Sequence, residues 1–344
     1  MSDKNTMLVS VIIPMRNEEK FVGKCLESFL QQIKSREDIE ILCVDGMSTD
    51  KTREIVERFS MVNHNIHLID NPSEIVPTGF NIAIGKSKGD FIAMVGCHAE
   101  YASDFIDKCL EVLKRTGADQ AGGYFITVPS KDTPVDRAIA AATSSSFGVG
   151  AGQRVPGPER ESNLSGFGCC RRDVFDRFGL FDERLVRNQD IELFHRIRRN
   201  GGKIVVSPDI GIKYYNRATF SGLINQAFLN GLWNPYTVWL TRSGVYLKHF
   251  IPLIFLLSII TLGLGGFLWQ PLWLALCCEL LVYVVAAWTT AIRLAGRAGT
   301  SSILIFLAFV QLHFAYGTGS LWGVLTAPFK FGFRCNRRIN KTLR

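Results

Sequence analysis

The sequence predicts an α/β protein with a doubly wound, mostly parallel sheet, followed by an α-helical membrane region. Two observations support this prediction. Short apolar runs alternate with segments of helical periodicity in the first half of the chain, and three long apolar stretches fill most of the sequence after Lys248. With 344 residues, the chain is long enough for one large domain and an appendage. We expect a globular domain over 1–245, a membrane region over 246–329 and a basic tail over 330–344.

The expected strands and helices alternate along the first 95 residues. Residues 8–13, LVSVII, form the first expected strand, and the apolar positions from Phe21 to Ile33 have helical spacing. Further elements are expected as strands at Ile39–Asp45, Ile66–Ile69 and Asp90–Val95, and as a helix over Thr78–Lys86. This alternation indicates parallel pairing. Ligands of parallel sheets bind beyond the carboxyl ends of the strands.

Three polar clusters follow expected strands. They are Pro14-Met15-Arg16-Asn17-Glu18, Asp45-Gly46-Met47-Ser48 and Gly96-Cys97-His98-Ala99-Glu100. Because the carboxyl ends of parallel strands meet at one edge of a sheet, we expect the clusters to form one site. No dinucleotide or P-loop glycine pattern follows a strand, so neither of those folds is indicated. The glycine-rich region 147–168 is expected to be a long surface loop.

The three apolar stretches each have the length that a helix needs to cross a membrane. They cover about residues 250–268, 271–292 and 303–329. Basic residues before the first stretch and after the second place the N-terminal domain in the cytoplasm, against the inner membrane. A third crossing would put the six-base tail outside, and Gly317, Gly319 and Gly323 favour a re-entrant or interfacial helix instead. A plain third crossing is the alternative.

Four blocks of the sequence resemble glycosyltransferase family 2. VSVIIPMRNEE, ILCVDGMSTDKT, GFNIAIGKSKGDFIAMVG and the segment from FGCCRRDVF to RRNGGKI have the family's order and roughly its spacing, within residues 8–215. The likeness is greatest to the exopolysaccharide branch that includes succinoglycan glucosyltransferases. It implies a GT-A fold, a nucleotide-diphosphate sugar donor and inversion at the anomeric carbon.

The resemblance implies roles for individual residues at the nucleotide. The family's nucleotide-binding positions fall on Pro14, Arg16, Asn17, Glu18, Asp45 and Asn81. The carboxylate of Asp45 is expected to accept a hydrogen bond from the base. Asp50 is either a second nucleotide contact or a residue that stabilises the start of a helix. Asn81 either passes near the donor or belongs only to the start of its helix.

The resemblance places the catalytic base in the motif NQD, at Asp190. One carboxylate is enough for inversion, because it takes the proton of the acceptor hydroxyl while the diphosphate leaves without needing an acid. At a helix N-terminus, Asp190 is expected to stay ionised. The alternative is that Asp190 only caps the helix.

The family's metal-binding D-x-D falls on Gly96-Cys97-His98-Ala99, so the first acid is missing. His98 and Glu100 remain as candidate ligands of a divalent cation, and manganese tolerates an imidazole better than magnesium does. Alternatively, Arg171 and Arg172 neutralise the leaving diphosphate without an ion. A purely structural His98 is the third interpretation.

The acceptor side has fewer indications. Arg171 or Arg172 matches a segment that contacts phosphate or acceptor sugar, and the glycine-rich loop before them is expected to be a lid. Gln226 and Trp233 fall where related synthases carry an acceptor-binding helix, although the spacing differs. An interfacial tryptophan is also a common membrane anchor.

These expectations define a membrane-bound hexosyltransferase, with glucose as the first candidate sugar, that acts on a lipid-linked oligosaccharide in exopolysaccharide or cell-surface glycan synthesis. The expected partners are the nucleotide-sugar donor, the lipid-linked acceptor and the membrane, and no nucleic acid. The alternative is a non-catalytic, membrane-bound nucleotide-sugar-binding partner with a degenerate metal site. Three apolar segments are too few for the channel of a processive synthase.

Overall fold

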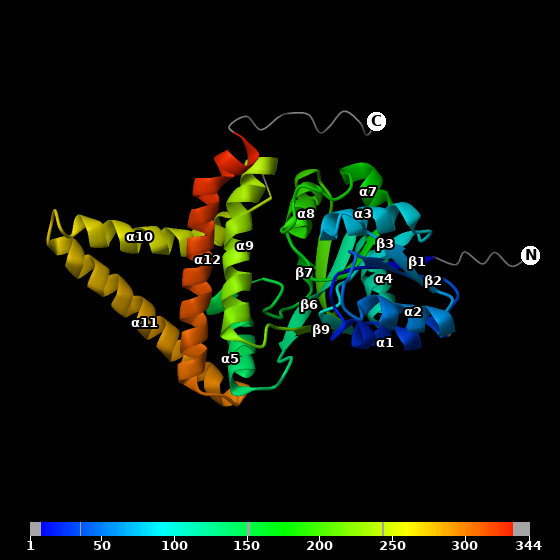
Figure 1. The fold of residues 1–344 in the computed structure, drawn as a ribbon, viewed down its shortest axis with the longest axis horizontal. Coiled ribbons are helices and arrows are strands. Elements are labelled where there is room, and N and C mark those ends of the chain that lie inside the picture. Colours follow the sequence, from blue (N-terminus) through cyan, green and yellow to red (C-terminus); the bar gives the residue numbers. More distant parts are fainter. Residues whose placement is uncertain (1–7, 35, 150–151, 243, 333–344) are drawn as a thin grey trace, which may run out of the picture. The chain divides into compact units, whose positions relative to one another are not determined.

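The computed structural model describes residues 8–34, 36–149, 152–242 and 244–332 (Figure 1). The chain forms two compact units. Unit 1 comprises Met1–Ile126 and Val155–Tyr214, and unit 2 comprises Thr127–Arg154 and Tyr215–Arg344. This division differs from the expected boundary near residue 245, because residues 127–154 and 215–245 pack with the apolar helices rather than with the sheet. Most of the basic tail, residues 333–344, lies outside the described residues.

Unit 1 is built on a nine-stranded sheet with the order β3-β2-β1-β4-β8-β6-β9-β5, in which β7 also pairs with β9. The strands are β1 Val9–Met15, β2 Ile39–Asp45, β3 Ile66–Asp70, β4 Phe91–Met94, β5 Ala99–Tyr101, β6 Gln120–Val128, β7 Arg160–Glu161, β8 Gly168–Arg171 and β9 Ile204–Tyr215. The neighbours among β3, β2, β1 and β4 are parallel, whereas β8 is antiparallel to both β4 and β6. The sheet is therefore mixed, with a parallel part where the expected strands lie.

Helices cover both faces of this sheet because the central strands are apolar on both sides. The helices are α1 Val22–Ile33, α2 Thr52–Val62, α3 Val76–Lys86, α4 Phe105–Thr116, α7 Asp173–Phe178 and α8 Gln189–Arg199. In β1, Val11 and Ile13 join the core beneath α1 and α4, whereas Ile12 joins the core with α3, α7 and α8. This alternation is the two-residue period of a strand buried on both faces. The expected elements of the first 95 residues are confirmed, with ends that differ by one or two residues.

Unit 2 is helical. Its elements are α5 Pro134–Thr143, α6 Ser146–Val149, α9 Phe220–Thr241, the 3₁₀ helix η1 Leu247–Phe250, α10 Ile251–Gly265, α11 Pro271–Ala298 and α12 Ser302–Phe331. Three segments are long and apolar enough to cross a membrane: Leu247–Gly265, Pro271–Ala298 and Ser302–Phe331. At about 1.5 Å per residue, a helix of 30 residues such as α12 is about 45 Å long, which exceeds the roughly 30 Å of a hydrocarbon core.

Glycines bring α9 and α12 into backbone contact. A Cβ added at Gly319 would lie 2.0 Å from the carbonyl oxygen of Phe228, and one at Gly231 would lie 2.0 Å from that of Tyr316. The expectation of a re-entrant segment rested on these glycines of α12. The structure shows one uninterrupted helix, so the small residues allow close helix packing rather than a chain reversal. An interfacial helix and a plain third crossing both agree with this helix.

Two polar side chains inside the apolar helices, His313 and Glu279, have hydrogen-bond partners. The Nδ1 atom of His313 lies 3.0 Å from the hydroxyl oxygen of Tyr283, and its Nε2 atom lies 3.1 Å from the carbonyl oxygen of Phe147 in α6. Glu279, the only acid in residues 215–344, accepts a hydrogen bond from Ser258 at 2.5 Å. These contacts compensate part of the cost of placing polar groups among apolar helices.

We predict that Gly319→Ala destabilises unit 2. The added methyl group would overlap the backbone of α9, and overpacking of this kind costs about 1–3 kcal/mol. The measurement is the thermal unfolding midpoint of the purified chain in detergent. The control is Gly296→Ala in α11, where nothing lies within 4 Å of the added Cβ. Equal midpoints for the two variants would contradict the packing role of Gly319.

Candidate active site

Three parallel strands of unit 1 end at the same level. Met15 of β1 pairs with Asp45 of β2, and Asp45 pairs with Asp70 of β3. The loops that follow these strands therefore start side by side at the carboxyl edge of the sheet. This is the edge at which α/β sheets bind ligands.

Hydrogen bonds join the loop after β1 to the loop after β2. The backbone N–H of Asn17 donates to Ser48 Oγ at 2.9 Å, and the side-chain oxygen of Asn17 accepts from the N–H of Thr49 at 2.9 Å. One residue later, the N–H of Glu18 donates to Thr52 Oγ1 at 2.7 Å. Asn17 has a φ of 55°, a left-handed conformation that asparagine tolerates better than most residues. Two of the three predicted clusters thus form one connected surface.

Asp45 lies beneath this surface with no solvent-exposed area. Its carboxylate accepts hydrogen bonds from the N–H of Ser48 at 3.0 Å and from Arg53 Nη1 at 2.9 Å. The same Arg53 nitrogen also donates to Asp70 at 2.8 Å. The expected direct bond between Asp45 and a base is therefore not available in this conformation, because protein groups enclose the carboxylate.

Sequence reasoning missed Arg53. Its position in the first turn of α2, eight residues after a buried acid, was the available signal. A buried carboxylate needs a partner, and a base in the helix that follows the strand is close enough to supply one.

Arg16 and Pro14 border the same edge. Arg16 forms an ion pair with Glu74 at 2.6 Å, and both side chains are more than two-fifths exposed. An exposed pair of this kind contributes little to stability, so Arg16 can exchange Glu74 for a ligand at low cost. Pro14 lies near the end of β1 and packs closely on α3. A Cβ added at Gly79 of α3 would lie 3.1 Å from the Cβ of Pro14.

Asp50 stabilises the start of α2. Its carboxylate accepts hydrogen bonds from the N–H and hydroxyl of Thr52 at 3.0 and 2.6 Å, and from the N–H of Glu19 at 3.2 Å. Desolvation raises the pKa of Asp50, but these hydrogen bonds outweigh it, so that the pKa is lowered. The structure thus favours the helix-start interpretation over a nucleotide contact.

The third cluster joins the site through His98. Its Nε2 atom lies 3.2 Å from Glu18 Oε1, and its ring packs on Phe21 with 4.4 Å between centroids. The side chains of His98 and Glu18 each retain about a fifth of their exposure. The loops after β1, β2 and β4 are therefore in contact, as the expected convergence requires.

Gly96 occupies the first position of the expected metal motif for a steric reason. A Cβ at Gly96 would lie 2.6 Å from the ring of Phe167, so no acid fits there unless that ring moves. The hydroxyl of Tyr101 also accepts from the N–H of Gly96 at 2.8 Å. The following Cys97 is buried in the core. Of these three consecutive residues, His98 is the one that reaches the site.

Glu100 is the central residue of β5, where it pairs with Lys213 of β9. Among the described residues, no group of three or more histidine, cysteine or acidic side chains has the geometry to hold a metal ion. The carboxylate that meets His98 is Glu18, which sequence reasoning assigned to the nucleotide.

Asn81 of α3 connects two elements of unit 1. Its amide nitrogen donates to the carbonyl oxygen of Phe181 at 3.0 Å and to Glu183 at 2.9 Å, and its oxygen accepts from the N–H of Phe181 at 3.0 Å. Through these hydrogen bonds, the side-chain amide of Asn81 fixes the segment that leads to α8. Asn81 does not join the connected surface formed by residues 16–18 and 45–53.

Asp190 lies in the first turn of α8. Leu193, Phe194 and Ile197 bury the helix in the core that it shares with α3 and α7. Asp190 itself keeps contact with solvent. Its Oδ1 atom accepts a hydrogen bond from the N–H of Ile191 at 2.9 Å.

The pKa of Asp190 is raised. Desolvation by the surrounding protein is the main cause, and the hydrogen bonds from the backbone N–H groups of Ile191 and of Asp190 itself oppose it. The expected effect of the helix N-terminus has the opposite sign. A raised pKa suits a proton acceptor, because the conjugate acid then forms more readily.

Arg171 and Arg172 lie at the opposite edge of the sheet. Because β8 is antiparallel to β4, Arg171 pairs with Phe91 at the start of β4. Arg172 donates to the carbonyl oxygen of Gly89 at 2.6 Å and to Ser87 Oγ at 2.7 Å, in the turn that precedes β4. The strand direction thus carries these arginines away from the cluster, so the structure does not bring them together with the other predicted site residues.

Gln226 and Trp233 belong to α9 of unit 2. Trp233 is only 8% exposed, its ring meets Tyr236 edge to face, and Lys330 Nζ lies 5.6 Å from its centroid. Both neighbours belong to unit 2. In this structure the ring of Trp233 is therefore a packing residue of unit 2, and its acceptor role stays a prediction. Gln226 is partly exposed.

The sheet order and the polar cluster at its carboxyl edge define a GT-A-like fold. The structure resembles the mannosyltransferase PcManGT from Pyrobaculum calidifontis, solved with GDP-Man and Mn²⁺, with a TM-score of 0.54 and 17% identity over 91% of this chain and 87% of that one. It also resembles residues 1–349 of S. aureus TarS, solved with UDP-GlcNAc, with a TM-score of 0.50 and 16% identity over 95% and 93% of the two chains.

Residues 10–179 match the family described as Glycosyl transferase family 2. The chain therefore carries a domain of this family and is a glycosyltransferase. It is 27% identical to a Methanococcus voltae protein named dolichyl N-acetyl-alpha-D-glucosaminyl phosphate 3-beta-D-2,3-diacetamido-2,3-dideoxy-beta-D-glucuronosyltransferase, over 92% of this chain and 98% of the relative. It is 25% identical to the succinoglycan biosynthesis protein ExoA of Rhizobium meliloti, over 92% and 96%.

We predict that Arg53→Met destabilises the fold and weakens donor binding. Removing one partner of a buried ion pair costs about 3–5 kcal/mol, and the remaining bonds from Ser48 reduce that loss. The measurements are the unfolding midpoint and the donor-induced thermal shift. Arg58→Met in the same helix is the control, because Arg58 forms an exposed ion pair with Glu54 and its loss is expected to stay within about 0.5 kcal/mol. Equal effects would contradict the role of Arg53.

Proposed function

We propose that this protein is an inverting hexosyltransferase that moves a sugar from a nucleoside-diphosphate donor to a lipid-linked saccharide at a membrane. The observation that carries the proposal is the contact of the loops after β1, β2 and β4 at one edge of the sheet. The three apolar helices of unit 2 support a membrane-bound acceptor. Holding the enzyme at the membrane concentrates it with a lipid-linked substrate.

The donor would bind over the connected surface. Arg16 and the partly exposed pair of Glu18 and His98 are the polar side chains that face this edge. Two solved structures of similar fold were determined with GDP-Man and UDP-GlcNAc, which supports a nucleotide-sugar donor. Asp45 would act by orienting Ser48 and Arg53 rather than by direct contact, unless Arg53 moves.

The acceptor follows from the relatives and from the helices. The archaeal relative is named for a dolichyl phosphate-linked sugar, and the bacterial relative for succinoglycan biosynthesis. We infer a saccharide on a lipid carrier, used in exopolysaccharide or cell-surface glycan synthesis. We further infer that unit 1 faces the cytoplasm at the inner membrane. The start of the first span carries Arg242 and Lys248, and the end of the second span carries Arg293 and Arg297. These two ends lie on the same side of the membrane, and basic residues favour the cytoplasmic side.

Asp190 is the proposed general base. Its carboxylate would take the proton of the acceptor hydroxyl as that oxygen forms a bond to the anomeric carbon. The bond from this carbon to the diphosphate oxygen breaks on the opposite face, and the diphosphate leaves with the electron pair. The anomeric configuration is therefore inverted.

A divalent cation fits the site only in part. Glu18 and His98 would supply one oxygen and one nitrogen ligand, and phosphate oxygens and water would have to complete the shell. When bound, such an ion neutralises charge that develops on the leaving diphosphate. The nitrogen ligand favours manganese over magnesium. A solved structure of similar fold contains Mn²⁺.

The rival function is a non-catalytic partner that only binds the nucleotide sugar. Asp190 keeps contact with solvent at the start of α8, where an acceptor hydroxyl can reach its carboxylate, and this position favours catalysis. Binding of donor without any turnover would be the signature of the rival.

We predict that Asp190→Asn lowers the transfer rate by about 10²–10⁴-fold, because the general base is lost. Donor binding, measured by thermal shift over a panel of nucleotide sugars, should persist. The control is Asp176→Asn, which changes an exposed acid in the first turn of α7. Wild-type rates in Asp190→Asn would overturn the assignment.

The pH dependence tests the same residue. The base must be deprotonated, so the rate should fall as pH drops through the raised pKa of Asp190, and this acid limb should vanish in Asp190→Asn. A raised folded-state pKa stabilises the fold only at low pH, and this contribution is lost as pH rises through that pKa. Asp190→Asn is therefore expected to be at least as stable as the parent at neutral pH.

We predict that transfer requires a divalent cation and that His98→Ala removes most of the activity. The measurement is the transfer rate with excess chelator and after addition of manganese or magnesium. His64→Ala, in the exposed turn between α2 and β3, is the control. Full turnover in excess chelator would show that the site works without an ion.

A further inference from the structure

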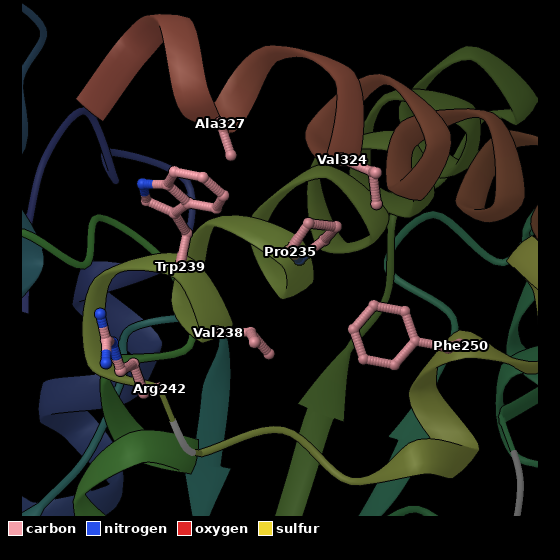
Figure 2. A pocket seen from close by; sticks show the side chains of 7 residues that line it. All are labelled: Pro235, Val238, Trp239, Arg242, Phe250, Val324 and Ala327. Atoms are coloured by element: carbon pink, nitrogen blue, oxygen red, sulfur yellow. The ribbon is translucent and has the colours of Figure 1, made fainter. Parts of the chain in front are cut away.

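Unit 2 contains a cavity of about 370 Å³ that the proposed catalytic site does not use. Apart from one basic residue, its walls are apolar and come from three helical elements: Pro235, Val238 and Trp239 of α9, Phe250 of η1, and Val324 and Ala327 of α12. Figure 2 shows these side chains around the space between α9 and α12. Volumes of roughly 300–1,000 Å³ are typical of small-molecule sites.

Arg242 is the single charged residue that lines this cavity. It follows the last turn of α9 in a left-handed conformation, with a φ of 55°, and it is exposed. In Figure 2 its side chain lies at the end of the wall away from Phe250. The cavity therefore presents an apolar interior with a guanidinium at one end.

The cavity lies at the ends of two candidate membrane spans. Phe250 is the fourth residue of the span that starts at Leu247, and Ala327 lies four residues before the end of the span that finishes at Phe331. Lys330 follows one turn after Ala327, with its ammonium 5.0 Å from the ring centroid of Tyr236. Basic and aromatic residues at span ends mark the level of lipid headgroups. The start of the first span and the end of α12 share one such level only if α12 runs along the membrane surface instead of crossing, and the lipid site requires that arrangement.

The charge balance of this region selects an anionic ligand. Within the part of unit 2 that the structure describes, nine lysines and arginines stand against three acids, Asp132, Asp136 and Glu279, and none of these acids lines the cavity. Arginine binds phosphate oxygens in a bidentate manner. A ligand with a phosphate next to a long apolar chain satisfies both parts of the cavity.

Pro235 supports a stable opening in this part of α9. Proline lacks the N–H that would bond the carbonyl of Gly231, and Ser320 of α12 donates to that carbonyl at 3.1 Å instead. The freed backbone group is therefore paired within the protein. The wall beside Pro235 can stay apolar without an unpaired carbonyl.

We propose that this cavity binds the phosphate and the first isoprenoid units of the polyisoprenoid-phosphate carrier that bears the acceptor sugar. The phosphate lies at Arg242, and the chain enters between α9, η1 and α12. The proposal rests on the proposed function for the identity of the lipid. It adds a binding site and a headgroup contact to unit 2.

The test is photolabelling of the purified full-length chain in phosphatidylcholine nanodiscs with a polyisoprenyl monophosphate whose first isoprene units carry a photoreactive group. Label is expected on α9 and α12 peptides. Unlabelled polyisoprenyl phosphate should compete with the probe, whereas phosphatidylglycerol should not. Equal competition by phosphatidylglycerol would overturn the proposal in favour of a general anionic-lipid site.

Two variants locate the label. Arg242→Gln removes the charge and should lower labelling about tenfold, because the loss of one charge-assisted hydrogen bond weakens binding by about that factor. Val324→Trp fills the cavity from a residue that is 47% exposed and should abolish labelling. The controls Arg293→Gln and Val285→Trp change exposed residues of α11 outside the cavity and should label as the parent does. Unchanged labelling in both cavity variants would refute the site.

Donor binding separates this inference from the proposed function. All four variants should keep the donor-induced thermal shift, which also shows that they are folded. If labelling follows the prediction but no sugar is transferred, the proposed function fails and the lipid site stands. If transfer to a lipid-linked acceptor is unchanged in Arg242→Gln and Val324→Trp, the lipid site fails and the function stands.

Discussion

The carboxylate of Asp45 is the group around which the candidate site is arranged. A fully buried charge is costly, and Asp45 is satisfied by Ser48 from its own loop and by Arg53 from the helix that follows. Ser48 in turn accepts from the N–H of Asn17, so the loop after β1 is held to the loop after β2. The same Arg53 nitrogen reaches Asp70 at the end of β3. Three strand ends therefore share one electrostatic constraint.

A different constraint organises unit 2. In its apolar helices, packing depends on close approach, and Gly231 and Gly319 let the backbones of α9 and α12 touch. His313, a polar residue within these helices, is paired with Tyr283 and with the carbonyl of Phe147. Basic residues such as Arg242, Lys248 and Arg297 stand at the ends of these helices.

Much of the fold was predictable because its signals are local. The period of two in β1 and β2 and the helical spacing in α1 each come from residues that are close in sequence, and the structure confirms these elements. The convergence of the strand-end clusters followed from parallel pairing alone. Two features were not predicted. One is the ion pair of Arg53 with Asp45, and the other is the ring of Phe167, which leaves no room for a side chain at Gly96. Each depends on side chains that only the folded chain brings together.

The sequence by itself determined the strands of the first 95 residues, which helices are apolar enough for a membrane, and which polar residues follow the parallel strands. Only the tertiary structure decided the direction of β8, which removes Arg171 and Arg172 from the site, and the meeting of His98 with Glu18. The physical reason is that periodicity reflects burial of neighbouring residues. Strand direction and side-chain partners instead depend on the free energy of contacts between residues that are tens of positions apart.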